Sequence, residues 1–219
     1  MYMKIITMPN INTKHGFATD KIEALKYLGE NIVMLKQEHS ADIIEVTNKN
    51  VYTLNDTIGD GLITQLKNVI LTCYVGDCAC IFIHAKDINA IAIVHSGWSG
   101  TFNYINEKMI TKLQTMGANL KNLSIAIGPS IAQESYQVDD QFYEKFIKQN
   151  KDSQQFFIKI NNQWHYNNAE YVAQKYRAHD IENIFISKQN TYTDDDLFSH
   201  RYYTHFGKKN GRMLGFIVL

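Results

Sequence analysis

The spacing of apolar residues along the chain predicts a mixture of helices and strands. Three apolar residues share one face of a helix over residues 20–28, which Asp20 can cap and Gly29 can end. The same spacing predicts helices at residues 101–116, from residue 139 onwards, and at residues 168–177. Short apolar runs predict strands at residues 32–35, 43–46, 69–72, 79–85, 88–94, 123–127, 156–160, 184–187 and 212–219.

These elements alternate without a strict strand–helix order, which favours an α+β fold over a doubly wound one. We expect a single domain over residues 1–219, built as a mixed β-sheet sandwich with flanking helices. The two prolines, Pro9 and Pro129, do not mark a linker, and no segment repeats at a fixed period.

Composition narrows the class of protein. The chain has 219 residues, 45% of them hydrophobic and 20% charged, as in an ordinary globular protein. Basic and acidic residues balance at 22 each, so no charge pattern indicates binding to nucleic acid or to a membrane surface. We expect no membrane-spanning segment and no signal peptide, and therefore a cytoplasmic protein. The three cysteines fall within eight residues, which suits a reduced protein better than a disulfide framework.

Two histidines and one cysteine have the context of a chemical site. His39 lies in KQEHSAD between two predicted strands, and His95 ends an apolar strand before GWSG. Cys78 follows Gly76 and Asp77 in a similar turn. If the three side chains meet, two imidazoles and a thiolate can hold zinc in tetrahedral geometry, with a fourth position open for water or substrate.

Other assignments of these residues stay open at this level. Cys78, Cys80 and His84 share one face of a strand and could form a different metal site, or Cys80 could simply be a core residue. Cys78 and His95 could instead be the nucleophile and base of a cysteine hydrolase, with Asp77 or His39 as the third group. A zinc ion could also be purely structural, in a binding protein without enzymatic activity.

Five motifs, in order, give the sequence a family resemblance. KQEHSAD is similar to a Q-V-H pattern, GDCACIFIHA to T-A-D-C with its following strand, and VHSGWSGT to H-A-G-W-R-G. AIGPSIAQESYQV resembles A-I-G-P-C-I followed by C-Y-E-V, and the C-terminal FSHRYY and GRM resemble F-S-Y-R-R and G-R-M. Together they extend from about residue 15 to the C-terminus and resemble the bacterial laccase-domain, or polyphenol oxidoreductase-like, family.

This resemblance implies both a fold and an activity. The fold would be the α+β type once grouped with cysteine hydrolases, and the activity that of a purine nucleoside phosphorylase acting on small nucleosides and phosphate. Adenosine deaminase and methylthioadenosine phosphorylase activities are implied as well. Motif by motif, the resemblance makes His39, Cys78 and His95 the zinc ligands. Copper, which the name laccase implies, remains the alternative metal of a polyphenol oxidoreductase, although three ligands are too few for a multicopper cluster.

The resemblance also suggests further site residues. We expect Arg201 to contact an anion or the base, Gln37 and Ser40 to be polar groups of the substrate pocket, and Asp77 to act in catalysis as a proton shuttle during deamination. Phe102 or Tyr202 could form a wall against the purine. The protein could be a monomer or a homodimer.

The sequence departs from the family pattern at several positions near these motifs. The substituted positions are Gly76, Ser99, Ser130, Thr191 and Tyr202. Ser99 replaces the arginine of H-A-G-W-R-G, and Tyr202 replaces the second arginine of Y-R-R. Both changes remove a cation, so the positive charge available to hold phosphate is smaller than in the family pattern.

Overall fold

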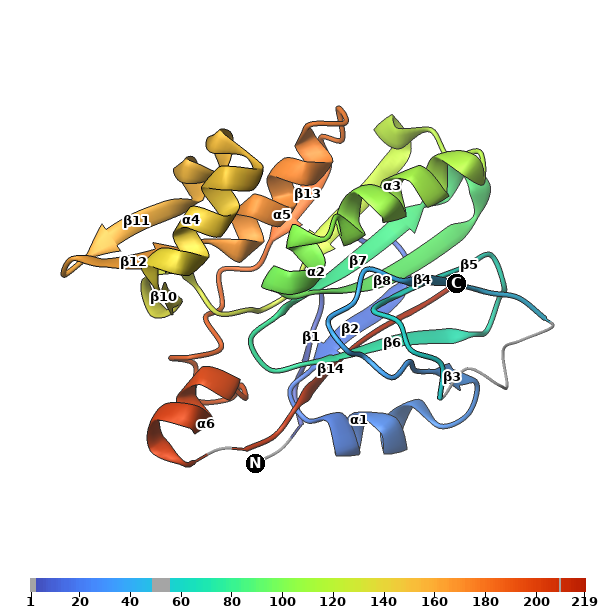
Figure 1. Ribbon diagram of the computed structural model, residues 1–219. Helices are drawn as coiled ribbons and strands as arrows, with labels where there is room; N and C mark the ends of the chain where they lie inside the picture. The colour runs from blue at the N-terminus through green and yellow to red at the C-terminus, as the bar shows by residue number, and fades with distance from the viewer. Residues whose placement is uncertain (1–2, 49–55, 209) are drawn as a thin grey trace.

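Two β-sheets lie face to face in the computed structural model, which describes residues 3–48, 56–208 and 210–219 (Figure 1). Within these ranges the larger sheet has six strands, in the order β13 (Ile184–Ile186), β9 (Leu123–Ile127), β7 (Ala79–Ala85), β8 (Ala90–Ser96), β5 (Gly61–Thr64) and β4 (Ile43–Val46). The second sheet has five, in the order β1 (Ile5–Ile6), β2 (Lys14–Ala18), β14 (Met213–Val218), β6 (Ile70–Val75) and β3 (Ile32–Val33). Both sheets mix parallel and antiparallel pairs.

Helices cover the outer faces of both sheets. The α-helices are α1 (Lys21–Leu28), α2 (Trp98–Phe102), α3 (Ile105–Thr115), α4 (Asp140–Gln149), α5 (Asn168–Arg177) and α6 (His200–Phe206). Short 3-10 helices are η1 (Lys86–Ile88), η2 (Leu120–Asn122), η3 (Gln133–Ser135) and η4 (Lys151–Phe156). Helices α3 and α5 lie on the six-stranded sheet, and α1 lies on the far side of the five-stranded sheet (Figure 1).

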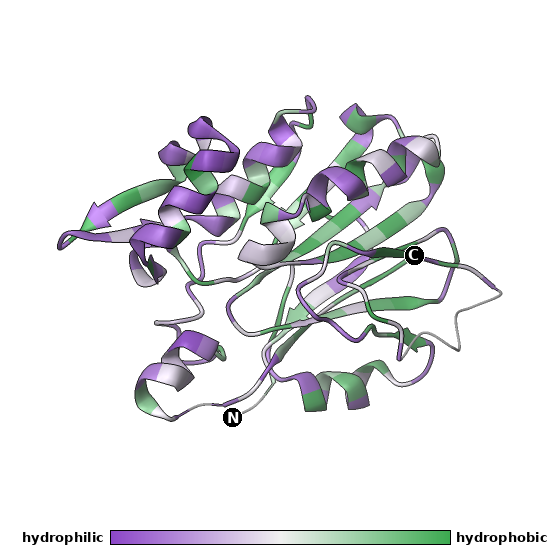
Figure 2. Ribbon diagram, in the orientation of Figure 1, coloured by the Kyte–Doolittle hydropathy of each residue, from purple (hydrophilic) through white to green (hydrophobic). Residues whose placement is uncertain are grey.

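The central strand β7 shows how the layers are held together. Its side chains are buried on both faces, because one face packs against the five-stranded sheet and the opposite face packs against the helices. Cys80 and Phe82 point into the core between the sheets, whereas Ile81 and Ile83 pack beneath α3 and α5. The apolar colour of the strands against the polar outer surfaces of the helices follows the same division (Figure 2). A strand buried on both faces has a nearly continuous apolar sequence, which is why the strand over residues 79–85 could be predicted from the sequence.

A third, smaller sheet sits beside these layers. It pairs β10 (Gln137–Val138), β12 (Gln163–Tyr166) and β11 (Phe157–Ile160), and α4 packs on it. The contact is almost wholly aromatic: Phe146, Phe157 and Tyr166 lie at its centre with ring centroids 4.8–5.7 Å apart. Rings at these separations gain from edge-to-face and offset contacts beyond the area they bury.

The predicted mixed-sheet sandwich with flanking helices is confirmed. Strands β4, β7 and β9 and helix α5 have the predicted bounds. The helix predicted over residues 101–116 is two helices, α2 and α3, because Tyr104 between them adopts the left-handed conformation with φ 66°. Strands β2, β5 and β12 were not predicted, since they are short and their apolar residues do not alternate over enough positions to be recognised.

Candidate metal centre

His39, Cys78 and His95 come together at one end of the two sheets. His39 lies in the connection between β3 and β4, Cys78 in the turn before β7, and His95 in β8. Strands β7 and β8 are antiparallel with Cys80 opposite His95, which brings the Cys78 turn to the end of β8. One ligand atom from each side chain lies within 4.8 Å of the others, and Cys78 Sγ is 3.8 Å from His39 Nε2.

A glycine makes this approach possible. A Cβ atom at Gly97 would lie 2.7 Å from Cys78 Sγ and 3.1 Å from His39 Cδ2. Such contacts are too short for a residue with a Cβ atom, so a glycine at position 97 leaves the space that the Cys78 and His39 side chains occupy. The VHSGWSGT motif contains Gly97, but only the structure shows that a glycine is needed there because Cys78 and His39 lie so close.

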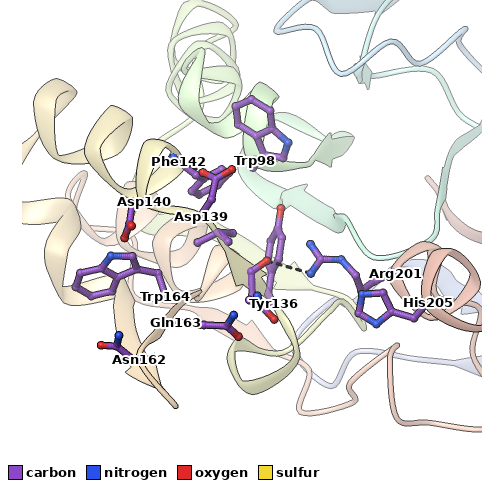
Figure 3. Close-up of a pocket in the computed structure, with 12 residues that line it drawn as sticks. Trp98, Tyr136, Asp139, Asp140, Phe142, Asn162, Gln163, Trp164, Arg201 and His205 are labelled. Atoms are coloured by element: carbon purple, nitrogen blue, oxygen red, sulfur yellow. Dashed lines mark hydrogen bonds between the residues drawn. The ribbon is translucent and has the colours of Figure 1, made fainter.

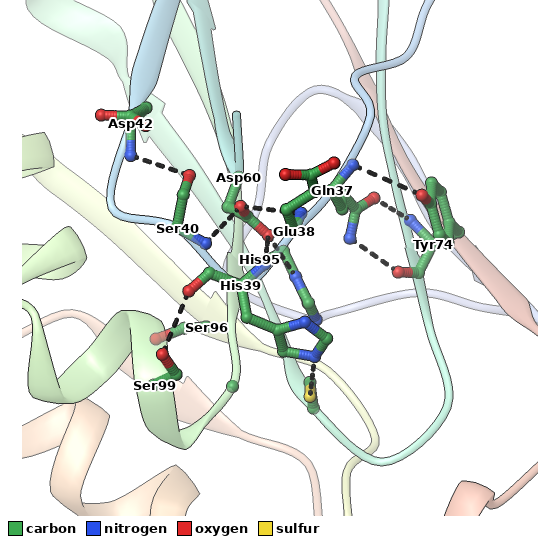
Figure 4. A network of polar contacts seen from close by, with 12 residues as sticks. Gln37, Glu38, His39, Ser40, Asp42, Asp60, Tyr74, His95, Ser96 and Ser99 are labelled. Carbon is green, nitrogen blue, oxygen red and sulfur yellow. Dashed lines mark hydrogen bonds and ion pairs between the residues drawn. The ribbon is translucent and has the colours of Figure 1, made fainter. Parts of the chain in front are cut away.

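A buried carboxylate, Asp60, organises the cluster (Figure 4). Its oxygens accept hydrogen bonds from the backbone N–H groups of Glu38 (3.2 Å), His39 (3.1 Å) and Ser40 (2.7 Å). The same carboxylate contacts His95 Nδ1 at 2.7 Å. His39 has a positive φ of 57°, and the three backbone hydrogen bonds hold this uncommon conformation. Asp60 therefore positions both histidines, and with Nδ1 engaged, His95 presents Nε2 to the cluster.

The electrostatics of the three side chains favour a thiolate. Burial raises the pKa of the Cys78 thiol, but the charge of His95 and the hydrogen bond with His39 outweigh it and bring the pKa to about 6. Burial lowers the pKa of His95, yet the Cys78 thiolate and Asp60 raise it to about 10. The pKa of Asp60 itself is lowered, because hydrogen bonds from His95 and Ser40 exceed the effect of burial. At neutral pH the metal-free cluster thus holds a thiolate beside an imidazolium.

This donor set fits a soft or borderline divalent metal. On a tetrahedral zinc ion, two nitrogen ligands and one sulfur ligand lie about 3.3–3.6 Å from one another. Cys78 Sγ and His39 Nε2 are 3.8 Å apart and all three ligand atoms lie within 4.8 Å, so zinc binding requires them to move slightly closer together. The Cys78 thiolate is the protonation state that a metal requires, and a metal displaces the proton of His95 on binding. Within the described ranges these residues form the one group of three ligands, and a metal held by three protein ligands would keep one coordination position for water or substrate.

The alternative metal site on β7 does not form. Cys80 lies in the core between the sheets, beneath Gly215 of β14, and His84 is at the other end of the strand. Burial and the neighbouring Cys80 raise the pKa of the Cys73 thiol, as expected for an unreactive core cysteine. Cys80 is therefore the buried core residue that the simpler interpretation predicted, and Cys73 is buried in the same core.

The cluster opens into a cavity of about 470 Å³. Gln37, Asp77 and Arg201 line it, as do His39, Cys78 and His95. Ser40 is absent from the lining: its hydroxyl oxygen accepts a hydrogen bond from the Asp42 N–H, and its own N–H binds Asp60. The structure therefore brings together all the predicted site residues except Ser40, which supports the loop behind them.

Two of the polar residues that line the cavity, Gln37 and Asp77, use their side chains in hydrogen bonds within the protein. The Gln37 amide donates to the Tyr74 carbonyl oxygen and accepts from the Tyr74 N–H, both at 2.9 Å. Asp77 accepts from the Thr191 hydroxyl at 2.6 Å and from the Arg201 N–H at 2.7 Å. Asp77 thus holds the start of α6 against the turn that carries Cys78.

The aromatic walls of the cavity differ from those expected. Phe102 packs in the aromatic cluster under α4, and Tyr202 lines a separate hollow with Tyr192 and Phe206. Trp98 and Tyr136 form the walls instead. Trp98 lies in the GWSG motif and is the kind of residue expected in a core or a pocket wall, whereas Tyr136 was missed although it lies in the SYQV motif.

A second hollow of about 570 Å³ adjoins the first and shares Trp98, Tyr136 and Arg201 with it (Figure 3). Arg201 stands between the two, with its guanidinium 5.5 Å from the centre of the Tyr136 ring and its Nη1 donating to the Gln137 carbonyl oxygen at 3.0 Å. The hollow is bounded on its far side by α4 and the β11–β12 hairpin.

Fold and cluster together define a class of protein: a mixed α/β sandwich with an open His–Cys–His centre at the end of two facing sheets. A family model described as multi-copper polyphenol oxidoreductase laccase matches residues 18–219, and the chain belongs to this family. The resemblance that the motifs indicated is confirmed.

Named relatives agree with this membership. A protein of Rickettsia prowazekii (strain Madrid E) named purine nucleoside phosphorylase is 32% identical over 197 residues, covering 88% of this chain and 80% of its own. A purine nucleoside phosphorylase of Borreliella burgdorferi is 31% identical over 176 residues, covering 78% and 74%.

Solved structures share the fold. The Bacillus licheniformis hypothetical protein YfiH has a TM-score of 0.83 at 23% identity, over 94% of this chain and 92% of its own. YlmD from Geobacillus stearothermophilus has a TM-score of 0.78 at 26% identity, over 90% and 77%. None of the described helices has the length and hydropathy that crossing a membrane requires.

Proposed function

We propose that this protein is a zinc-dependent purine nucleoside phosphorylase that converts adenosine or inosine and phosphate to the free base and ribose-1-phosphate. The observation that carries the proposal is the His39–Cys78–His95 cluster, open to a cavity of about 470 Å³, in a chain whose relatives are named for this activity. The proposed enzyme is a single domain over residues 1–219, cytoplasmic, and a monomer or homodimer. Adenosine deaminase and methylthioadenosine phosphorylase are proposed as further activities of the same site.

Zinc held by His39, Cys78 and His95 would supply a Lewis acid with one open coordination position. Zinc is proposed over copper because three protein ligands with a fourth position open is the arrangement of catalytic zinc sites. Blue-copper sites share two His and one Cys but typically add an axial Met, and no Met is among the described residues that line this cavity.

The chain's own residues supply the rest of the chemistry. In phosphorolysis a phosphate oxygen forms a bond to C1′ of the ribose as the C1′–N9 bond breaks, and its electron pair stays on the purine, which takes up a proton. The positive charge that develops on the sugar is stabilised by a bound phosphate anion, which the Arg201 guanidinium is placed to hold. Trp98 and Tyr136 exclude water around the base.

Tyr136 is suited to donate a hydrogen bond to the departing purine. Burial is the main cause that raises the pKa of its hydroxyl, and nearby Cys78 raises it further, so the phenol keeps its proton at neutral pH. Asp77 holds Arg201 in the cavity through the backbone, and a direct catalytic role for Asp77, as for Gln37 and Ser40 in substrate binding, remains a prediction.

The test is turnover by metal-analysed protein. Zinc-loaded protein with inosine and phosphate should release hypoxanthine and ribose-1-phosphate, which chromatography measures. Cys78→Ala should lose both zinc and turnover, whereas Cys73→Ala, which removes a buried thiol outside this cavity, should keep both. Absence of turnover by the zinc-loaded protein would contradict the proposal.

A cysteine hydrolase is the second candidate, and one observation favours it. Cys78, His95 and Asp60 stand in series as a nucleophile, a base and an orienting carboxylate. If this candidate is right, metal-free protein hydrolyses an activated thioester and added zinc inhibits it. The phosphorylase proposal expects the reverse, with turnover lost on chelation and restored by zinc.

A further inference from the structure

The arginines of this chain are distributed unevenly over its surface. The sequence contains three, Arg177, Arg201 and Arg212. Arg201 and Arg212 both line the cavity in front of the metal centre, although Arg201 belongs to α6 and Arg212 directly precedes β14. Arg177 lies at the end of α5 and forms an exposed ion pair with Glu170.

Neither cavity arginine is neutralised by a carboxylate. Among the ion pairs of the described residues none includes Arg201 or Arg212, whose Nη1 atoms donate instead to the carbonyl oxygens of Gln137 (3.0 Å) and Gly211 (2.7 Å). Asp77 is the carboxylate in the cavity lining, and both of its oxygens accept hydrogen bonds from other groups. A guanidinium carries five N–H donors, so most donors of each arginine are available to a ligand.

The surrounding structure holds both side chains at the cavity. The backbone N–H of Arg201 donates to Asp77, and the Arg201 side chain is held by its Nη1 hydrogen bond to the Gln137 carbonyl oxygen and lies against the Tyr136 ring. Arg212 is close to Gly76, where an added Cβ would lie 3.9 Å from Arg212 Nη1 and 3.4 Å from the His200 Cβ and N atoms. The turn that carries Cys78 is thus in contact with a second cationic residue and a histidine.

The positive charge of Arg212 affects the pKa of the nearby Lys21. Lys21, whose N–H donates to the Arg212 carbonyl oxygen, lies with its Nζ 4.3 Å from the centre of the Tyr74 ring. Its pKa is lowered, first by burial and then by the charge of Arg212. Arg201 and Arg212 thus bring two positive charges to the cavity, and the one carboxylate among its described lining residues, Asp77, accepts hydrogen bonds from the Arg201 backbone and from Thr191 rather than from either guanidinium.

We propose that Arg201 and Arg212, with His200 beside them, form the binding site for inorganic phosphate. The inference rests on the proposed function, in which phosphate is the attacking co-substrate. Two forked guanidinium groups match the oxygens of a phosphate dianion, and a partly buried setting strengthens each charge-assisted hydrogen bond. Ser99, which stands where the family motif has an arginine, donates its hydroxyl to the His39 carbonyl oxygen and adds no charge to the cavity, so Arg201 and Arg212 are the arginines that line it.

The experiment measures phosphate binding directly, without nucleoside. Zinc-loaded protein is titrated with inorganic phosphate by calorimetry, for the unchanged chain and for Arg201→Gln, Arg212→Gln and the matched control Arg177→Gln. Loss of a charge-assisted pair should weaken phosphate binding about 10- to 100-fold in the two cavity variants, with Arg177→Gln within about twofold of the unchanged chain. Arg212→Lys, which keeps the charge but loses the fork, should fall between, and it carries the test if Arg212→Gln does not fold.

Turnover measurements separate this inference from the proposed function. In Arg212→Gln, the KM for phosphate should rise while the KM for inosine stays within about twofold. Arginine-dependent phosphate binding without any nucleoside turnover would uphold the anion site and contradict the phosphorylase. Turnover with an unchanged phosphate KM in Arg212→Gln would support the phosphorylase and contradict the anion site.

Two further outcomes would overturn the assignment. One is phosphate binding that follows the zinc content and ignores both arginines, which would place the anion on the metal. The other is arginine-dependent binding of adenosine 5′-monophosphate with none of free phosphate, which would make this a site for a substrate's own phosphate group.

Discussion

Single side chains decide the chemistry of the metal centre, and the most influential of them ligates nothing. Asp60 accepts three backbone N–H groups and contacts His95, so one buried carboxylate sets the orientation of both imidazoles. An asparagine has the same shape but one acceptor oxygen, and its amino group would face N–H donors. Groups behind metal-bound histidines commonly contribute about 10- to 100-fold to metal affinity.

We therefore expect Asp60→Asn to lower zinc affinity by about 10- to 100-fold, as measured by competition with a chromophoric chelator. Asp42→Asn is the matched control, because the exposed Asp42 contributes its backbone to the same loop and its side chain forms no hydrogen bond with the described residues. Equal affinities in the two variants would mean that the histidines hold their positions without Asp60.

At the scale of elements, local sequence signals and tertiary packing act together. Helix α1 begins where the sequence indicates, with the Asp20 carboxylate accepting from the N–H groups of Ile22 (2.8 Å) and Glu23 (3.1 Å). It ends at Gly29, which has a φ of 74°. Its buried Ala24 packs with Ala18 and Leu214 of the five-stranded sheet, and the partly buried Leu25 and Leu28 extend this contact. Capping and packing therefore act together to hold this helix in place.

Asp20→Ala should cost about 1 kcal/mol of unfolding free energy, because two N–H groups lose their acceptor. For a chain of this size that corresponds to a fall of about 2–4 °C in Tm, measured by calorimetry. Asp20→Asn keeps an acceptor at the cap and should stay near the unchanged Tm. A similar fall in both variants would point to lost charge rather than lost capping.

At the scale of the whole molecule, the distance between the two sheets depends on a glycine. A Cβ atom at Gly215 of β14 would lie 2.4 Å from Cys80 Sγ and 3.0 Å from Phe82 Cζ, both on β7. Strand β14 is central in its sheet, between β2 and β6, so it cannot shift without moving its partners. The facing side chains fill the remaining space, and overpacked cores lose stability.

Gly215→Ala should therefore destabilise the protein by about 1–3 kcal/mol in denaturant unfolding. Adding Cys80→Ala removes the sulfur that the new methyl group would meet, so the double variant should be more stable than the sum of the two single changes predicts. Additive costs would show that the sheets adjust to the methyl group by another route.

The candidate site was only partly predictable from the sequence. His39 stood out because it lies between two predicted strands, and Cys78 and His95 because each adjoins an apolar strand near a glycine; the motif order connected the three. Asp60 was missed, since a buried acid in a loop has no periodic pattern around it. Arg212 was missed because its position before an apolar strand gave no sign that it lines the cavity.

Alone, the sequence determined the elements whose signals are local: the doubly buried strand β7, the capped helix α1, and the motifs that identify the family. Tertiary structure decided everything that depends on pairing between distant segments. Tyr104, in the left-handed conformation, divides one predicted helix into two. Asp60 forms hydrogen bonds with both His39 and His95, which are 56 residues apart in the sequence. Periodicity reports which face of an element is buried, whereas the identity of what faces it is set by the pairing of strands, which no local pattern contains.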